Sequence, residues 1–361
     1  MDRHLTRRTF AAATMAATTL GLIAPALRAQ EASPEASPVA TDSPLSPEIP
    51  NGGIQADGSW AFTDDRGVTL TLPQTPTKVV AFVGFAAALY DLGYEVAAYY
   101  GGALEADGSR STLAGNLPLD RIPSVSGNDG ADEYSLDVEK LVALGTELFI
   151  GPSYGITADP GVIWPFDASV LEQVGAFAQV MHVAQDDGAD VERTIETMAN
   201  LAGALGVDLA GAENAAAKDA FDTAKAELQD AIAAKPNLTT LWIAAQGTGF
   251  WVQSASYDIT YLQKLGAQFV GGLENGSIEQ SWETFATSWA ADLIFIDVRQ
   301  PYWWGVEQLT AEVPTFALHP AVAAGQVAGW YNTFVPSYAA FTPIMQGYTE
   351  AFLNADETIV P

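Results

Sequence analysis

The sequence predicts an α/β protein with two Rossmann-like lobes, mainly parallel sheets and one long helix joining the lobes. Strand-like and helix-like segments alternate along residues 57–208 and again along residues 235–361, which is typical of parallel sheets flanked by helices. Residues 209–234, between these regions, show one long amphipathic pattern. A chain of 361 residues is also long enough to bury two substantial cores.

The joining helix is expected at residues 209–234, where apolar side chains recur every three or four positions. The recurring residues are Ala217, Phe221, Ala224, Leu228 and Ile232. Asp208 is the expected N-cap, and Pro236 ends the run because proline cannot continue a helix. At 1.5 Å per residue, such a helix would be about 39 Å long.

The composition indicates a globular protein and excludes several classes of partner and chemistry. Hydrophobic residues make up 48% of the chain and charged residues 16%, as in folded globular proteins. After residue 29 the chain holds 11 basic and 43 acidic residues, a net charge near −32, which argues against nucleic acids and anionic membranes as partners. Because there is no cysteine, disulfides, thiolate chemistry and a lipid-bearing cysteine are excluded.

Residues 1–29 are predicted to be a twin-arginine-type signal peptide. Arg7 and Arg8 precede a short apolar run at residues 11–23, and small residues follow up to Ala29. The run is too short and too rich in alanine for a transmembrane helix. Cleavage after Ala29 is therefore expected, with an uncleaved anchor as the alternative.

Residues 30–56 are rich in proline, serine, alanine and glutamate, a composition that predicts a disordered linker. No later apolar segment approaches 18 residues, so no membrane span is expected in the mature chain. The sequence thus predicts an exported protein, located in the periplasm, outside the cell or at its surface.

The N-terminal lobe, residues 57–208, is expected to open with a β-hairpin. Short β-prone runs at residues 61–63 and 68–72 flank a turn signal at residues 64–67. The later strands are predicted at residues 78–83, 96–99, 148–150 and 178–182. The helices are predicted at residues 86–92, 138–144, 170–175 and 191–205.

The C-terminal lobe, residues 235–361, repeats the alternation without repeating the sequence. Its strands are predicted at residues 239–245, 268–270, 293–298, 314–318 and 326–330. Its helices are predicted at residues 259–265, 282–289 and 339–353. Both lobes are therefore expected to have sheets with helices on their faces.

Four stretches carry a family resemblance. They are FTDDRGVTLTLP with PTKVV at 62–80, LYDLGYEV at 89–96, LDVEKLVAL with ELFI at 136–150, and SWE with ADLIFI at 281–296. In this order, across roughly residues 57–355, they resemble the class III solute-binding proteins, which deliver ferric siderophores, haem or cobalamin to ABC importers. The resemblance implies two lobes joined by one rigid helix, the class III periplasmic-binding fold, and a binding protein that is not an enzyme.

The resemblance also implies two residues that contact a permease. The family docks on its ABC permease through an exposed glutamate on each lobe, and by motif position these resemble Glu139 and Glu283. Two carboxylates at a fixed separation would let the permease recognise both the alignment of the bound protein and the closure of its lobes. The alternative is that each is an ordinary acidic residue whose negative charge stabilises the N-terminus of its helix. We expect a monomer.

Candidate ligand contacts follow the predicted strands, because ligands of open α/β sheets bind beyond the carboxyl ends of strands. The candidates in the first lobe are Phe85, Tyr99, Tyr100, Ser153 and Tyr154, with Tyr134 added by the resemblance. The candidates in the second lobe are Phe250, Trp251, Tyr257, Arg299, Tyr302, Trp303, Trp304, Trp330 and Tyr331. So many aromatic side chains suit a large, flat, partly apolar ligand. The alternative for several of them is a place in the core.

Arg299 is the strongest single candidate, because only five arginines follow residue 29 and this one follows a predicted strand. A guanidinium can bind a carboxylate, catecholate or hydroxamate oxygen in a bidentate manner. The alternative is a salt bridge to Asp297 or Glu307. The shortage of basic residues disfavours a strongly anionic ligand. The preferred ligand is an iron–siderophore-type chelate, with haem or cobalamin as alternatives.

A binder of bare zinc or manganese would need a histidine-rich site. After residue 29 the chain contains only His182 and His319, far apart in the sequence. We therefore expect no protein-held metal site and no intrinsic cofactor.

A secreted hydrolase that uses Ser153 is the alternative of another class. Residues 151–155 match G-x-S-x-G after a predicted strand, and Asp292 or Asp297 and then His319 follow in the order of a triad. Such a serine must lead directly into a helix, however, and the next ten residues contain two prolines and no helical period. We therefore predict no catalytic residues.

Overall fold

A computed structural model gives the fold of the chain after the predicted signal peptide. The residues that it describes are 52–105, 107–127, 132–154, 162–185, 189–253, 256–271, 277–299 and 302–360. They belong to one compact unit, Asp42–Pro361. The predicted signal peptide and most of the predicted linker lie outside the described residues. Within the described part, none of the helices combines the length and the apolar character needed to cross a membrane.

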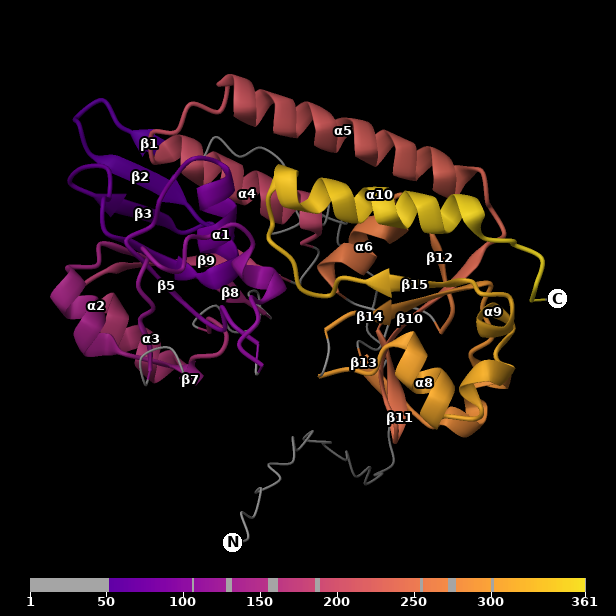
Figure 1. Cartoon of the computed structure of the whole chain (residues 1–361). Coiled ribbons are helices and arrows are strands. Elements are labelled where there is room, and N and C mark those ends of the chain that lie inside the picture. The colour runs from indigo at the N-terminus through magenta and orange to yellow at the C-terminus, as the bar shows by residue number, and fades with distance from the viewer. Residues whose placement is uncertain are drawn as a thin grey trace, which may run out of the picture. The chain divides into compact units, whose positions relative to one another are not determined.

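The N-terminal lobe is built on four parallel strands in the order β5-β4-β8-β9 (Figure 1). The strands are β4 (Val79–Phe82), β5 (Ala98–Tyr100), β8 (Leu148–Ser153) and β9 (Gln179–Ala184). The helices are α1 (Val83–Asp91), α2 (Val138–Leu144), α3 (Ala168–Gly175) and α4 (Val191–Ala204). Every residue of β4 and β8 is buried, because helices cover both faces of such a sheet.

The predicted opening hairpin is confirmed as part of a small antiparallel sheet, β1-β2-β3. Its strands are β1 (Gly52–Ile54), β2 (Trp60–Thr63) and β3 (Thr69–Leu72). Trp60 Nε1 donates to the carbonyl of Ala204 at 2.8 Å, and the backbone N–H of Ala184 donates to Asp65 at 2.9 Å. These bonds attach the hairpin to α4 and β9. The lobe also contains η1 (Thr112–Ala114), β6 (Ser126–Gly127) and β7 (Asp132–Leu136).

The predicted joining helix is α5 (Ala212–Ala233), and α10 (Tyr338–Asn354) packs along it (Figure 1). The helix begins later than expected, because its N-cap is Gly211. Asp208 instead accepts a hydrogen bond from the N–H of Ala210 at 3.0 Å, before the helix starts. The buried residues of α5 are Phe221, Ala224, Leu228, Ala231 and Ile232. The expected apolar face is thus present, with Ala217 at its edge.

The C-terminal lobe has a mixed sheet in the order β13-β11-β10-β14-β15, with β12 paired to β10. The strands are β10 (Thr239–Gln246), β11 (Gly249–Gln253), β12 (Gln268–Phe269), β13 (Ser277–Gln280), β14 (Leu293–Asp297) and β15 (Val327–Trp330). Strands β12, β14 and β15 join the sheet parallel to their partners, as predicted, whereas β10, β11 and β13 pair antiparallel. The sequence prediction missed β11 and β13.

The remaining elements of this lobe are helical. They are α6 (Tyr257–Lys264), η3 (Trp282–Thr284), α7 (Phe285–Ser288), α8 (Val306–Glu312), η4 (Phe316–Leu318) and α9 (Pro320–Ala323). The strand predicted at residues 314–318 was wrong: Phe316–Leu318 form a 3₁₀ turn with Phe316 buried. The helix predicted at residues 282–289 is a 3₁₀ turn followed by one short α-helix.

The two lobes share part of their hydrophobic core. Val191 and Ile195, at the start of α4, pack in the same cluster as α5, α6, β10 and α10 residues. Two ion pairs reinforce this junction, from Lys225 of α5 to Glu192 and from Lys264 of α6 to Asp190, the N-cap of α4. Helix α4 therefore belongs to the first lobe and also packs against the second.

Candidate functional site

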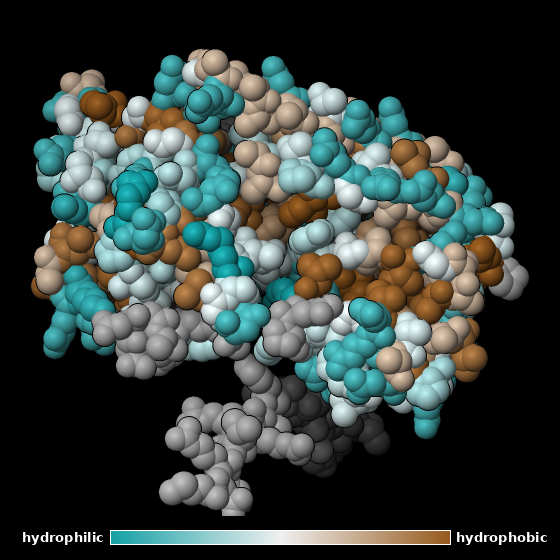
Figure 2. Space-filling model, in the orientation of Figure 1, coloured by the Kyte–Doolittle hydropathy of each residue, from teal (hydrophilic) through white to brown (hydrophobic). Residues whose placement is uncertain are grey.

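Segments that follow strands of the two sheets contact each other across the two lobes. Thr112, in the turn after β5, shares a hydrogen bond of 3.0 Å with Thr333, which follows β15. Ser337 Oγ donates to Asp91, at the end of α1, at 2.6 Å. Hydrophobic surface gathers near the middle of the face shown in Figure 2, around the position of β14 and β15 in Figure 1.

In the C-terminal lobe, four predicted aromatic residues gather beside these strand ends. We call Trp251, Tyr302, Trp303 and Trp304 the aromatic cluster. The ring of Trp303 lies 5.3 Å from that of Trp251 and 5.1 Å from that of Tyr302, between centroids. The backbone N–H of Trp304 donates to Ala245 of β10 at 2.8 Å. The cluster is thus fixed to the β10–β11 hairpin.

A glycine makes room for Trp304. A Cβ on Gly247, in the two-residue turn between β10 and β11, would lie 2.4 Å from the Trp304 ring. The ring therefore covers the turn directly. A pocket of about 520 Å³ opens at this place, which we call the rim pocket. It is lined by Gln246, Gly247, Thr248, Tyr302, Trp304 and Glu312.

The indole N–H of Trp303 is shielded from solvent and has no acceptor among the described residues. A buried donor without a partner costs about 1–3 kcal/mol. An oxygen atom of a bound molecule would recover that free energy. The sequence identified Trp303 as a candidate by its position after a strand, but not by this unsatisfied donor.

In the N-terminal lobe, the exposed aromatic surface consists of other residues. Tyr134 is 61% exposed and its ring lies 5.8 Å from that of Trp164, which also contacts Phe82. Tyr154, at the end of β8, is half exposed. Trp164 was missed by the sequence prediction, although it lies in the connection between β8 and α3. Extending the strand-end rule over the whole connection would have found it.

Arg299 follows β14 as predicted, and its guanidinium is already engaged. It forms a salt bridge with Asp297, and Nε donates to both carboxylate oxygens at 3.0 Å. Asp297 is fully buried, and Asn332 also donates to it at 3.4 Å. The salt bridge that the sequence offered as the alternative is therefore present. It compensates the charge of Arg299 without excluding a contact with ligand.

Several other predicted contacts pack in the hydrophobic cores of the two lobes. Phe85, Tyr100, Phe250 and Trp330 are each 2% exposed or less, and Tyr99 is 8% exposed. Tyr100 stacks on Phe149 with ring centroids 4.9 Å apart. We exclude these five residues from the ligand contacts that we propose.

Trp330 instead forms a buried hydrogen bond with a carboxyl group. Its indole N–H donates to Asp258, at the start of α6, at 2.6 Å. Ser256 also bonds to this carboxyl group. Burial raises the pKa of Asp258 to about 6. The two hydrogen bonds lower this pKa, but their effect is smaller than that of burial.

For two further candidate ligand contacts, Tyr331 and Tyr257, the structure does not decide between a contact with ligand and a place in the core. Tyr331 is 40% exposed, and its backbone N–H approaches the hydroxyl of Tyr348 at 3.5 Å. The side chain of Tyr257 lies outside the described residues. Both therefore stay predictions.

The serine triad of the alternative hydrolase is not assembled among the described residues. Ser153 has no exposed surface, and its Oγ lies 2.6 Å from both the carbonyl of Val162 and His182 Nδ1. His319 instead caps α9: its Nδ1 accepts from Ala321 and its Nε2 faces the carbonyl of Trp289 at 3.0 Å. The alternative hydrolase reading was wrong, because the serine is inaccessible and the histidine is committed to a helix cap. Gly155 of the motif lies outside the described residues.

His182, which does contact Ser153, is not poised as a base. Burial is the main cause that lowers its pKa to about 3, and the nearby Arg66 adds to the effect. Its backbone N–H donates to Asp64 at 3.2 Å. The Ser153–His182 contact therefore joins β8 to β9, and the backbone of His182 joins β9 to the opening hairpin.

The two predicted docking residues are both exposed and both lie in the first turn of a helix. Glu139 is in α2, which is capped by Asp137, and Glu283 is in η3, which is capped by Ser281. These positions suit a contact with a partner and also suit the helix dipole.

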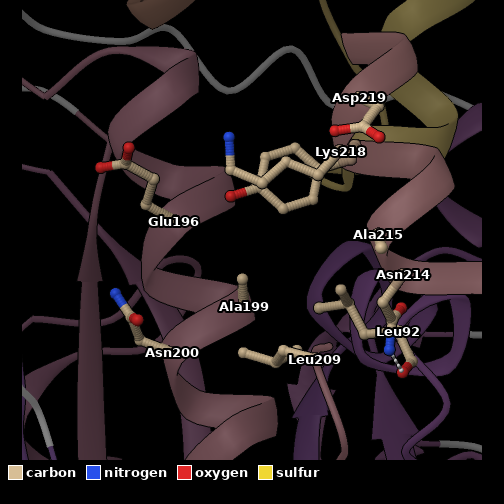
Figure 3. Close-up of a pocket in the computed structure, with 10 residues that line it drawn as sticks. Leu92, Glu196, Ala199, Asn200, Leu209, Asn214, Ala215, Lys218 and Asp219 are labelled. Atoms are coloured by element: carbon tan, nitrogen blue, oxygen red, sulfur yellow. Dashed lines mark hydrogen bonds between the residues drawn. The ribbon is translucent and has the colours of Figure 1, made fainter. Parts of the chain in front are cut away.

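A second pocket lies between α4 and α5, away from the strand ends (Figure 3). Its volume is about 500 Å³, and Glu196 of α4 faces Lys218 and Asp219 of α5 across it. Lys218 pairs with Asp222 at 2.6 Å and lies 5.7 Å from the ring centre of Tyr338. None of the predicted ligand contacts lines this pocket. Among the described residues, no group of three or more histidine and acidic side chains could hold a metal ion.

Comparison with known proteins gives structural relatives. DesE, a ferric-siderophore receptor from Streptomyces coelicolor, is 31% identical over 82% of this chain and 99% of its own, with a TM-score of 0.72. A siderophore periplasmic binding protein from the fuscachelin gene cluster of Thermobifida fusca is 19% identical over 78% and 97%, with a TM-score of 0.55. SirA from Staphylococcus aureus, solved with staphyloferrin B, is 15% identical over 82% and 99%, with a TM-score of 0.57. No family model and no curated protein matches the chain.

Proposed function

The chain belongs to the class III substrate-binding proteins, and on this premise we propose that it binds a ferric siderophore between its lobes and presents it to an ABC permease. The similarity to DesE, at 31% identity over nearly the full length of that receptor, carries the proposal. The protein has a substrate-binding role and is not an enzyme. Haem and cobalamin remain the alternative ligands.

The aromatic cluster supports a chelate as ligand. Ferric chelates of organic ligands are large, partly apolar bodies with oxygen atoms at their surface. Trp251 and Trp303 offer apolar surface, and the indole N–H of Trp303 offers a donor without an acceptor in the described part. Tyr134 and Trp164 would cover the ligand from the first lobe. We propose that the ligand lies between these two aromatic surfaces.

The shared core at α4 supports a binding mode with little movement between the lobes. One long helix, α5, joins the lobes, and α10 packs along it. Bending this pair would break apolar contacts of Phe221 and Leu228. We therefore expect the ligand to cause a small closure only.

Ligand binding is tested by the quenching of tryptophan fluorescence, because three tryptophans belong to the aromatic cluster. Purified protein without residues 1–29 is titrated with a ferric hydroxamate, a ferric catecholate, haem and cobalamin. We expect a ferric siderophore to bind with a dissociation constant below about 10 μM, roughly 7 kcal/mol. Binding of haem or cobalamin alone would replace the proposed ligand. If none of the four binds, the proposed function is wrong.

Delivery to a permease is a separate step, and we propose that Glu139 and Glu283 carry it. Both are exposed, one on each lobe, as docking requires. The double variant Glu139→Ala/Glu283→Ala is expected to abolish uptake of the ferric ligand by cells and to leave its affinity unchanged. Glu307→Ala is the matched control, because Glu307 is also an exposed acid in a first helical turn. Uptake that survives the double variant would exclude these two residues as the docking contacts.

The cellular location that fits this role is outside the cytoplasm. We propose export by the twin-arginine route followed by cleavage after Ala29. Mass spectrometry of the protein released from its native host tests both points: an N-terminus at Gln30 is expected, and an intact N-terminus would indicate a retained anchor.

A further inference from the structure

We propose that the ligand site selects ferric chelates that carry no net negative charge. This inference rests on the proposed function and names the substrate class within it. It is derived from the position and pairing of every positive charge after residue 29.

Arg299 is the basic residue beside the aromatic cluster, and its carbonyl accepts from the backbone N–H of Trp303 at 2.8 Å. Its guanidinium donates through Nε and Nη2 to Asp297, a carboxylate with no exposed surface, and its backbone N–H donates to the same carboxylate. Asn332 donates to the same carboxylate. The pair is therefore neutral overall. A bidentate ion pair of this kind is strong, so an anionic ligand would have to compete with a buried partner.

Most of the other basic residues pair with acidic side chains or lie away from the carboxyl ends of the strands. Seven of them also form salt bridges with acidic side chains: Arg66, Arg121, Lys140, Arg193, Lys218, Lys225 and Lys264. Lys78 precedes β4, at the amino end of the sheet, and Lys235 follows α5 and donates to the carbonyl of Ala355. Only Arg110, among the described basic residues without a salt bridge, lies in a segment that follows the carboxyl end of a strand.

Arg110 by itself cannot balance a highly charged anion. Its Nη1 is engaged with the carbonyls of Gly115 and Leu117, at 3.2 Å and 2.8 Å. On the opposite lobe, Glu312 places a negative charge in the rim pocket beside Tyr302 and Trp304. Arg110 and Glu312 carry opposite charges, so together they add no net positive charge to the two lobes.

No hidden positive charge lies in the internal segments outside the described residues. From the sequence, these segments contain no lysine and no arginine. They contain the acids Asp129, Asp159, Asp186, Asp187 and Glu274. The whole mature chain carries a net charge near −32. An anionic chelate is thus repelled at long range, without a local cluster of cations to reverse the repulsion.

The aromatic cluster favours the opposite sign. A cation over a tryptophan or tyrosine ring is attracted by the ring quadrupole, and this attraction grows when the pair is desolvated. Tyr302 and Trp304, which line the rim pocket together with Glu312, therefore accept a positively charged group on a chelate and disfavour a carboxylate in that pocket.

The test uses one ferric trihydroxamate with a pendant amine and two derivatives of that amine. The parent complex is singly positive, the N-acetyl derivative is neutral, and the N-succinyl derivative is singly negative, with the same iron centre in all three. A ferric tris-catecholate with three negative charges is the fourth probe. Affinities are measured by isothermal titration calorimetry at low and at high salt.

We expect the positive and neutral complexes to bind and the succinyl derivative to bind at least tenfold more weakly. The tris-catecholate should not bind. The difference between the positive and negative complexes should shrink at high salt, because salt screens charges. Equal affinity of the acetyl and succinyl derivatives, or tight binding of the tris-catecholate, would overturn the inference and leave the proposed function standing. Failure of all four probes would instead contradict the proposed function.

Two variants, Glu312→Gln and Asp297→Asn, test which residues produce the selectivity for the charge of the chelate. Glu312→Gln should reduce the preference for the positive over the negative complex about threefold, in the range of an exposed charge contact. Glu307→Gln on the same helix is the matched control, because Glu307 is exposed and does not line the rim pocket. An equal effect of both variants would assign the preference to the net charge of the protein and overturn the role of the rim pocket.

Asp297→Asn should release the charge of Arg299 and strengthen binding of the succinyl derivative. Because Asp297 is fully buried, its variant is compared with the natural protein by circular dichroism and melting temperature before titration. A folded variant with unchanged affinity for the succinyl derivative would show that Arg299 does not face the ligand. Glu312 is on a separate helix and gives an independent result if the Asp297 variant does not fold.

Discussion

The two lobes both contain parallel strands that end at one edge of a sheet, but the residues at these two edges differ. At the carboxyl ends of the N-terminal sheet, Ser153 and His182 satisfy each other inside the lobe, and both are buried. At the corresponding ends of the C-terminal sheet, Trp303 keeps a shielded N–H without an acceptor in the described part. The hydroxyl of Tyr100, at the end of β5, also has no partner in the described part, but Tyr100 is fully buried in the core of its lobe. Trp303 is only partly buried, so its N–H belongs to a side chain that a ligand can reach. The comparison indicates that the C-terminal lobe supplies most of the specific contacts with a ligand.

The largest expected effect is a loss of ligand affinity, and it should differ between variants of the two lobes. Trp303→Ala removes apolar surface and the unsatisfied donor together, and we expect the affinity for the ferric ligand to fall about 100-fold. Tyr134→Ala removes an aromatic side chain from the first lobe and should cost about tenfold or less, because Tyr134 is 61% exposed. Calorimetric titration of both variants checks the order. A larger loss for Tyr134→Ala would place the main contacts in the N-terminal lobe.

The buried histidine of the first lobe gives the next effect, which depends on pH. The pKa of His182 is lowered from 6.5 to about 3 in the folded protein, so the unfolded chain binds more protons between these values. The free energy of unfolding should therefore fall as pH is lowered from about 6.5 towards 3. His182→Gln, which keeps polar atoms facing Ser153, should remove this part of the decrease. Urea unfolding at several pH values measures it, and an unchanged slope in the variant would contradict the assignment.

The buried carboxyl group of the second lobe should respond in the opposite direction. The pKa of Asp258 is raised from 3.8 to about 6 in the folded protein, so the folded state binds more protons in this range. Its contribution to stability is complete below about pH 4 and is lost as pH rises towards 6. Asp258→Asn should be more stable than the natural protein above pH 6, by at most about 3 kcal/mol, and similar to it at pH 4. A variant that is destabilised equally at both pH values would show that the hydrogen bonds to Trp330 and Ser256 outweigh the buried charge.

The first lobe could be predicted well from the sequence because its signals are local. Helix α2 begins and ends at the predicted residues, with Asp137 as its cap and Gly145 in the left-handed conformation at its end. The all-parallel alternation of strands and helices also leaves few other topologies. Asp208 misled the prediction of α5, since an Asx-type bond to Ala210 uses the same residue type as a cap.

The second lobe was harder to predict because an antiparallel hairpin interrupts the alternation. The residues of β11 were interpreted as ligand contacts, yet Phe250 is buried and its neighbour Trp251 is partly exposed, as successive residues of a strand must be. The position of Arg299 and of residues 302–304 after a strand was predictable. The choice between core and surface was not, because it depends on distant partners: Trp330 bonds to Asp258, 72 residues away in the sequence.

The central claim, that a ferric chelate binds at the aromatic cluster, is tested most directly by NMR spectroscopy of the tryptophan indole N–H groups. Signals are assigned by single tryptophan-to-phenylalanine variants, and the gallium complex of the same chelate serves as the diamagnetic control. The paramagnetic ferric complex is predicted to broaden the signals of Trp251, Trp303 and Trp304 beyond detection and to leave that of Trp60, which is bonded to Ala204 in the opening hairpin. Loss of the Trp60 signal with a persistent Trp303 signal would contradict the account.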